Sequence, residues 1–123
     1  MKAYDIRSTM NGTPSWVSEG GEAAFWVPEP FNDGMLWMGR FTGQSPWERH
    51  PDGDEFIHVL EGEVEVTMLA DDGPAQITVS AGSVFIVPRG LWHKQVASAE
   101  VTQVGATPGR TEHSELEDPR MLP

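Results

Sequence analysis

The chain lacks cysteine, and this absence excludes disulfide bonds, thiolate metal sites and a cysteine nucleophile. It is also poor in positive charge, since eight Lys and Arg against nineteen Asp and Glu give a net charge of -11. Such a charge repels phosphate backbones and anionic lipids, so nucleic acids and membrane surfaces are poor candidate partners. No apolar run approaches the ~20 residues of a membrane span, and the first residues lack the apolar segment of a secretory signal. We therefore expect a cytoplasmic protein.

Glycine and proline, in contrast, are abundant, with 13 Gly and 10 Pro among 123 residues. This density interrupts the sequence too often for long helices. Short runs that alternate apolar and polar residues fill most of residues 35–105, as where Val64, Val66 and Met68 share one face of a half-buried strand. The predicted strands are Met35–Thr42, Phe56–Leu60, Glu63–Met68, Ile77–Val79, Val84–Val87, His93–Ala97 and Glu100–Val104. Many short strands with tight turns predict an all-β sandwich or closed barrel in one domain.

The two flanks of this strand-rich region have less regular patterns. Residues 1–34 are predicted to be a strand or loop region that packs on the barrel of residues 35–105, with Phe25 and Trp26 covering the core. Residues 106–123 show no periodicity and are predicted to form a surface arm or a disordered tail. His113 in this tail is expected in solvent, and a gate over a pocket mouth is the alternative.

Histidines and carboxylates suggest a metal site. Glu48 and His50 are two residues apart, so on an extended backbone both side chains leave the same face. Glu55 follows a turn that can bring its carboxylate back towards His50, and His93 adds a second imidazole if its strand lies near the first hairpin. Imidazole with carboxylate is a ligand set for one divalent ion such as Zn, Mn, Fe or Ni. The alternative is that these polar residues only hydrogen-bond one another or a ligand.

The sequence around His93 resembles a motif of the cupin family. The run Gly82-x5-Pro88-x-Gly90-x2-His93 reproduces the second cupin signature, G-x5-P-x-G-x2-H-x3-N, except that Ala97 replaces the final Asn. The motif thus lacks whatever that Asn contributes in the family.

The first cupin signature, G-x5-H-x-H-x3,4-E-x6-G, is also recognisable. The chain reads Glu48-x-His50-x4-Glu55-x6-Gly62, so that Glu48 takes the place of the first His. Gly43 precedes Glu48 with one residue too few between them. The exchange of a carboxylate for an imidazole adds a negative charge and favours Mn, Fe or Zn.

The resemblance implies a small single-domain, RmlC-like cupin with a double-stranded β-helix (jelly-roll) barrel. It implies that His50, Glu55 and His93 are metal ligands, with Glu48 in the place of a fourth. It further implies an enzyme that acts through the metal on a small keto, carboxylic or aromatic substrate, as an oxidoreductase of dioxygenase type, a decarboxylase or an isomerase. The alternative is a non-catalytic sensor that binds a metabolite in the same place.

Four further side chains are candidates for the substrate pocket. Trp47 and Trp92 directly precede Glu48 and His93 and are predicted to stack on a flat substrate, with core or interface packing as the alternative. Arg89 is predicted to hold a substrate carboxylate, with a surface turn residue as the alternative. Arg40 shares a strand face with Leu36 and Met38 and is predicted to reach the barrel interior.

An outward-facing apolar set predicts self-association. With Glu55, Ile57 and Val59 directed inward, Phe56, His58 and Leu60 point out of the barrel. A small barrel with such residues has apolar surface to bury, which predicts a homodimer.

Overall fold

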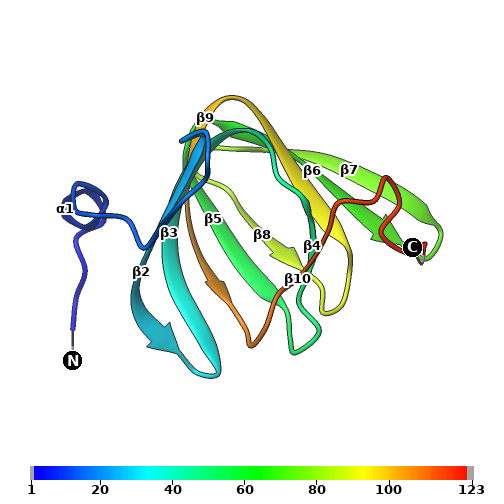
Figure 1. Ribbon diagram of the computed structural model, residues 1–123, viewed down its shortest axis with the longest axis horizontal. Coiled ribbons are helices and arrows are strands. Elements are labelled where there is room, and N and C mark those ends of the chain that lie inside the picture. Colours follow the sequence, from blue (N-terminus) through cyan, green and yellow to red (C-terminus); the bar gives the residue numbers. More distant parts are fainter. Residues whose placement is uncertain (1, 122–123) are drawn as a thin grey trace.

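The computed structural model describes residues 2–121, which form strands and one short helix (Figure 1). The elements are α1 (Ile6–Met10), β1 (Trp16–Val17), β2 (Ala23–Phe31), β3 (Gly34–Gln44), β4 (Trp47–Arg49), β5 (Glu55–Glu61), β6 (Glu63–Ala70), β7 (Gly73–Ser80), β8 (Val84–Val87), β9 (His93–Thr107) and β10 (Glu112–Ser114). The strands pair antiparallel in one curled sheet, and the predicted all-β jelly-roll barrel is confirmed. No helix in the described range has the length and hydropathy needed to cross a membrane.

Strand β9 is the centre of the sheet. Residues 93–96 pair with β6 and residues 102–106 pair with β5, whereas β3 pairs with β9 along most of its length. The sequence predicted two separate strands in this region, which is wrong. Residues 98–100 are exposed and break the apolar pattern, but the backbone stays extended because β9 exchanges one partner strand for another at this point.

The main core lies inside the curl. Strand β5 places Ile57 and Val59 inward and Phe56 and His58 outward, in the predicted alternation. Gly105 of β9 lies against the indole of Trp37, because a Cβ there would come within 2.4 Å of the ring. The glycine therefore lets the Trp37 indole approach β9 closely, and the indole N–H donates to the Thr107 hydroxyl.

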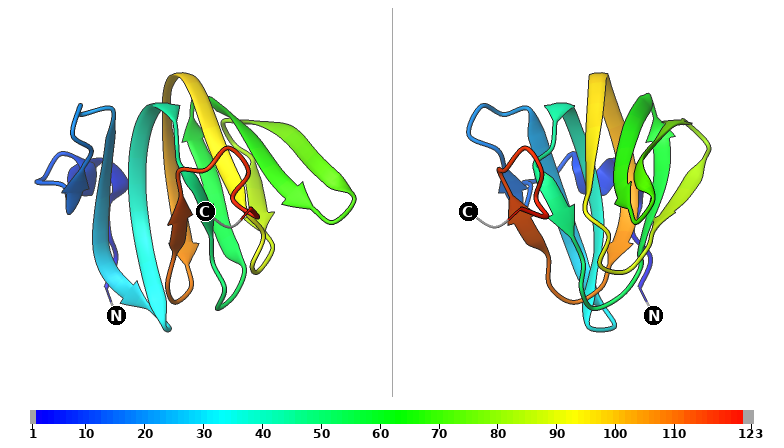
Figure 2. Two further views of the ribbon diagram at one scale, coloured as in Figure 1. Left: turned by 45° about the vertical axis from the view of Figure 1, so that its right-hand side comes forward. Right: turned by 90° about the vertical axis from the view of Figure 1, so that its right-hand side faces the viewer.

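The N-terminal residues cover the outside of the sheet. Helix α1, capped by Asp5, packs beside β2 (Figure 2), where Trp26 and Met38 form a second, smaller apolar cluster. Phe25 points to the opposite side and meets Trp37 at 5.7 Å between ring centroids. The two aromatic residues predicted to cover the core thus lie on opposite faces of β2.

Arg40 lies on the outer face, and its predicted position inside the barrel is wrong. Its guanidinium carbon lies 5.0 Å from the centroid of the Trp26 ring. The error arose because β3 is apolar on both faces: Trp37 and Phe41 face the main core, while Met38 faces the helix. The apolar residue Met38, two positions before Arg40, therefore did not show that Arg40 faces the barrel interior.

The C-terminal residues up to Met121 form a surface arm that lies along the sheet. Strand β10 pairs with β4, and the two run side by side in Figure 1. Arg49 binds Glu112 at 2.9 Å, and the indole of Trp47 donates to the carbonyl oxygen of Glu117 at 3.1 Å. These contacts join residues far apart in the sequence, which is why local periodicity gave no sign of them.

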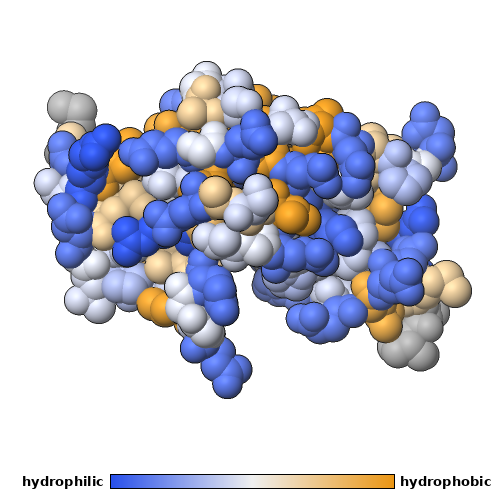
Figure 3. Space-filling view, turned by 90° about the horizontal axis from the view of Figure 1, so that it is seen from above, coloured by the Kyte–Doolittle hydropathy of each residue, from blue (hydrophilic) through white to orange (hydrophobic). Residues whose placement is uncertain are grey.

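Polar and apolar residues are unevenly distributed over the surface. On the face seen from above (Figure 3), hydrophilic residues predominate and hydrophobic residues form separate small groups. Elsewhere, Phe56 of β5 pairs with Ile86 of β8, and His58 pairs with Val84. Phe56, Ile86 and Val84 are exposed on the outer face of the barrel.

Candidate metal centre and adjoining cavity

Three strands bring the predicted metal ligands together. Glu48 of β4 pairs in register with His93 of β9, while His50 follows β4 and Glu55 begins β5. One ligand atom from each of Glu48, His50 and His93 lies within 4.8 Å of the other two. Residues forty-five positions apart therefore present two imidazoles and a carboxylate to one point.

Glu55 places its carboxylate between the two histidines. Its Oε1 lies 3.2 Å from Nε2 of His50 and 3.6 Å from Nε2 of His93. Its Oε2 accepts a hydrogen bond from the hydroxyl of Thr107, which in turn accepts one from the Trp37 indole N–H at 2.8 Å. The second oxygen is thus anchored, and the first stays directed at the imidazoles.

The histidine rings are held through their Nδ1 atoms. Nδ1 of His93 lies 3.1 Å from the carbonyl oxygen of Leu91. A carbonyl oxygen only accepts, so a neutral His93 carries its proton on Nδ1 and offers the lone pair of Nε2 to a metal. Nδ1 of His50 is 3.0 Å from the hydroxyl of Thr111.

Among residues 2–121, Nε2 of His50 is the one fully buried side-chain nitrogen or oxygen atom without a hydrogen-bond partner. It lies near Glu55, but without the alignment of a hydrogen bond. An unsatisfied buried polar atom costs about 1–3 kcal/mol. A cation between the two Nε2 atoms and the carboxylates would remove that cost, so the residues present fit a metal ion.

Burial and neighbouring charges shift the pKa values of this cluster. Burial, reinforced by the negative charge of Glu55, raises the pKa of Glu48. Burial also opposes ionisation of Glu55, but its contacts with His50 and His93 outweigh burial and lower its pKa to about 2. Burial disfavours charged His93, yet the interaction with Glu55 prevails and raises the His93 pKa above 6.5. Glu55 is therefore a carboxylate paired with an imidazole that readily takes up a proton, and a divalent cation would displace that proton.

His113 contacts this cluster, although the sequence placed it in solvent. Its Nε2 lies 3.4 Å from Oε1 of Glu48, and its side chain remains 57% exposed. Together with Thr111, it lines the cavity from the C-terminal arm. The arm therefore forms part of the wall beside the candidate metal ligands.

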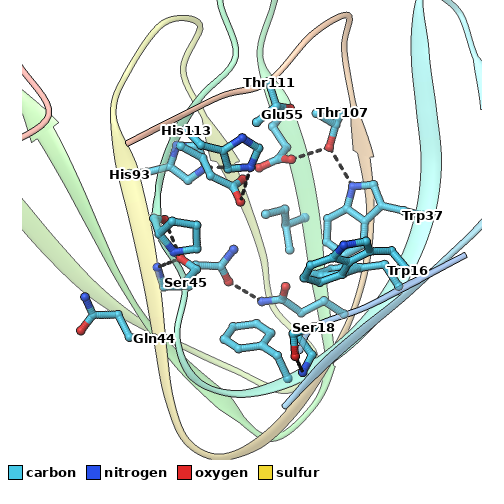
Figure 4. Close-up of a pocket in the computed structure, with 18 of the residues that line it drawn as sticks. Trp16, Ser18, Trp37, Gln44, Ser45, Glu55, His93, Thr107, Thr111 and His113 are labelled. Atoms are coloured by element: carbon cyan, nitrogen blue, oxygen red, sulfur yellow. Dashed lines mark hydrogen bonds and ion pairs between the residues drawn. The ribbon is translucent and has the colours of Figure 1, made fainter. Parts of the chain in front are cut away.

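A cavity of about 830 Å³ adjoins the candidate ligands. In Figure 4, His93, Glu55 and His113 lie on one side of the pocket, and Trp37 and Trp16 lie on the other. Sequence reasoning missed several lining residues: Trp16, Phe25, Phe41, Gln95 and Gln103. The alternation of buried and less buried residues along β9 could have identified Gln103, because it lies between the inward-facing Val101 and Gly105.

Trp47, Trp92, Arg89 and Arg40, predicted to line the pocket, do not contribute to this cavity. Trp47 lies on the opposite side of β4 from Glu48, under the ammonium group of Lys94. Trp92 lies below the guanidinium of Arg49, and Arg89 donates to the carbonyl oxygen of Pro51. In an extended chain the neighbour of an inward-facing residue faces outward, which explains both tryptophans.

Comparison with known proteins identifies the family. The profile of the cupin domain matches residues 41–114. The chain belongs to the cupin family.

Curated relatives of this cupin match only part of it. A germin-like protein 1-1 of Oryza sativa subsp. japonica is 46% identical over 54 residues, which are 43% of this chain and 25% of the relative. The uncharacterized protein YdbB of Bacillus subtilis is 36% identical over 64 residues, 51% of this chain and 53% of the relative. The cupin thus covers between a quarter and about half of the length of these proteins.

Solved structures share the same fold. An oxalate oxidase superposes with a TM-score of 0.66 at 21% identity, covering 82% of this chain and 59% of the other. A variant of Bacillus subtilis oxalate decarboxylase gives a TM-score of 0.70 at 13% identity, covering 85% of this chain and 30% of the other. A cupin-2 domain protein of Shewanella frigidimarina gives 0.59 at 28% identity, covering 68% and 78%. These similarities support the jelly-roll fold.

Proposed function

We propose that this cupin is a metal-dependent enzyme that binds a small organic substrate through one divalent ion. The proposed ligands are Nε2 of His50, Nε2 of His93, and carboxylate oxygens of Glu48 and Glu55. The observation that carries the proposal is the buried Nε2 of His50, which lacks a hydrogen-bond partner while facing a carboxylate and a second imidazole. Two imidazoles with two carboxylates suit Mn, Fe, Zn or Ni.

The residues around the proposed ligands keep them in position. Thr107 anchors one oxygen of Glu55, and the carbonyl oxygen of Leu91 fixes the tautomer of His93. When bound, the ion would act as a Lewis acid on substrate oxygen atoms and, as iron or manganese, would also support redox chemistry. Nε2 of His113 lies 3.4 Å from Oε1 of Glu48 at the exposed end of the cluster, and we propose that it contacts the substrate there.

Two structural neighbours guide the choice of metal and substrate probes. One is an oxalate oxidase in complex with glycolate, and another is a Bacillus subtilis oxalate decarboxylase described by its Mn(II) centres. For this cupin we therefore propose Mn²⁺ as the first metal to test and oxygen-rich organic molecules as the substrate class. Oxidation and decarboxylation both remain within the proposal, and a cytoplasmic location stays a prediction.

Elemental analysis of the purified protein tests the metal site. We expect about one divalent ion per chain in the wild type and loss of that ion in His50→Ala and His93→Ala, because each removes an imidazole ligand. His58→Ala is the matched control, since His58 lies on the outer face of β5 and should leave the metal content unchanged. Equal metal content in all four proteins would contradict the proposed site.

Turnover then separates an enzyme from a sensor. Mn²⁺-loaded protein is incubated with hydroxy, keto and aromatic acids, and oxygen uptake and carbon dioxide release are recorded. Turnover that disappears in His93→Ala supports the enzyme. Stoichiometric metal with substrate binding but no turnover in any condition would favour the metabolite sensor.

We also propose that two chains form a homodimer through the outer face of β5 and β8. Phe56, Val84 and Ile86 are neighbours there through strand pairing and are exposed in the single chain. Contiguous apolar residues on a charged surface favour burial against a second copy.

A further inference from the structure

The cavity continues well beyond the proposed metal ligands. Its volume of about 830 Å³ lies in the upper part of the ~300–1,000 Å³ range of small-molecule sites. Away from the ligands its wall is mainly apolar and includes Trp16, Phe25, Val27, Met35, Trp37, Phe41 and Ile57. A ligand that touched only the proposed metal would leave most of this wall facing water.

The charges of the wall disfavour a ligand with two negative charges. Among the described residues, no Lys or Arg lines the cavity, while Glu22, Glu48 and Glu55 do. The cations nearest in the sequence to the ligands are engaged outside: Arg49 with Glu112, and Lys94 with Trp47. A divalent ion would be neutralised by ionised Glu48 and Glu55, so a dianion would bring unbalanced charge into a poorly hydrated site.

The cavity wall also includes two side-chain amides, those of Gln95 and Gln103. Gln103 is 1% exposed, and its Nε2 donates to Oε1 of Gln95 at 2.7 Å. This hydrogen bond leaves the second polar atom of each amide, Oε1 of Gln103 and Nε2 of Gln95, outside the contact between them. The pair thus offers an acceptor and a donor to one neutral polar group of a ligand.

We propose that the substrate is an aromatic molecule with a neutral or singly ionised pair of neighbouring oxygen atoms, rather than a small dicarboxylate. This proposal rests on the proposed metal-dependent function. The oxygen pair lies at Glu48, His50 and His93, and the aromatic body lies against Trp37 and Phe41, with Trp16 over it. Gln95 and Gln103 contact a carbonyl or hydroxyl group between the two ends.

Two hydroxamic acids with the same head group test the proposal. Acetohydroxamic acid and benzohydroxamic acid present the same pair of oxygen atoms, but only the second carries a ring. Binding to Mn²⁺-loaded protein is measured by titration calorimetry, with oxalate as the dianionic probe. We expect benzohydroxamic acid to bind about tenfold more tightly than acetohydroxamic acid, since transfer of a ring from water to an apolar wall supplies at least the ~1.4 kcal/mol of that ratio. We expect oxalate to bind more weakly than both.

The Trp16→Ala variant tests whether the ring of benzohydroxamic acid lies against Trp16. Phe31→Ala is the matched control variant. Both are aromatic residues about half exposed, Trp16 at 53% and Phe31 at 54%, but only Trp16 lines the cavity. We expect Trp16→Ala to reduce the preference for benzohydroxamic acid at least about threefold while leaving acetohydroxamic acid unchanged, because a stacked indole is removed. Phe31→Ala should change neither affinity.

Different results would contradict the aromatic substrate and the proposed metal-dependent function. Equal affinity for the two hydroxamic acids, tighter binding of oxalate, or a preference that Trp16→Ala does not alter would overturn the aromatic substrate while the metal content stays stoichiometric. Absence of metal from the wild-type protein under conditions that load it would overturn the proposed function, and the substrate assignment with it.

Discussion

Replacing Thr107 with valine tests the connection between the barrel wall and the proposed metal ligands. The Thr107 hydroxyl donates to Oε2 of Glu55 and accepts from the indole N–H of Trp37. A hydroxyl has one hydrogen to donate and lone pairs to accept, so this one group satisfies both neighbours at once. Valine keeps the shape of the side chain but satisfies neither.

The expected loss of stability follows from these two contacts. A buried N–H left without a partner, here that of Trp37, costs about 1–3 kcal/mol, and a hydrogen bond to a carboxylate contributes about 1.5–3 kcal/mol. The Glu55 carboxylate keeps its contacts with His50 and His93, so part of the second contribution is retained. We therefore expect Thr107→Val to lower the free energy of unfolding of metal-free protein by about 2–4 kcal/mol.

Denaturant unfolding of metal-free protein measures this change. The midpoint should fall and the dependence of the unfolding free energy on denaturant should stay constant, because little surface is altered. Thr102→Val is the matched control on the same strand, with its side chain on the opposite face from Gln103, and should stay within about 0.5 kcal/mol of the wild type. In addition, Thr107→Val should weaken Mn²⁺ binding by about 10–100-fold, the usual effect of losing a group that orients a ligand. Wild-type stability and wild-type metal affinity in Thr107→Val would refute the reasoning.

Three further predictions concern metal affinity, the pH dependence of stability, and assembly. Because the pKa of His93 is raised above 6.5, Mn²⁺ affinity should begin to fall while the pH is still above 6.5 as acid is added. Calorimetric Mn²⁺ titrations at a series of pH values measure this. A fall in affinity that starts only below pH 6.5 would contradict the prediction. In metal-free protein, ionised Glu55 contributes to the free energy of unfolding above pH 4.5, and this contribution is lost as the pH falls towards 2. Protonated His93 contributes below pH 6.5, and its contribution is lost as the pH rises through its raised pKa. Light scattering should give about twice the 13.6 kDa chain mass for the wild type and for Ile77→Asp, and the single-chain mass for Phe56→Asp; a monomeric wild type would contradict the dimer.

Local sequence was sufficient for the strand pattern and for the turn beside His93, whereas the approach of His93 to Glu48 and His50 was implied by the resemblance to cupins. The turn before His93 is specified by Pro88 and Gly90, and Gly90 has a φ of +76°, a conformation that few other residues adopt. The spacing of Glu48 and His50 put both on one strand face, and the structure brings Glu48, His50 and His93 together. Such features depend on backbone geometry within a few residues, which a sequence pattern reports directly.

The cavity wall could not be predicted in the same way, because it is assembled from residues of several strands. Phe25 and Trp26 are adjacent and equally apolar, yet only Phe25 faces the cavity, since α1 covers the other face of β2. Strand β3 is likewise apolar on both faces, which is why Arg40 was predicted on the wrong face. Where both faces of a strand are covered, hydrophobicity alone does not identify the inner one.

The C-terminal arm shows how a short segment becomes part of a site without a pattern of its own. Only Glu112–Ser114 pair with β4, too few residues for a recognisable period. The arm is held instead by contacts from β4 and the residue after it: Trp47 to Glu117, Arg49 to Glu112, and His50 to Thr111. Two of these contacts come from positions adjacent to Glu48, so the arm and the proposed ligands share one support. A change that displaces the arm should therefore alter the metal site and the cavity wall together.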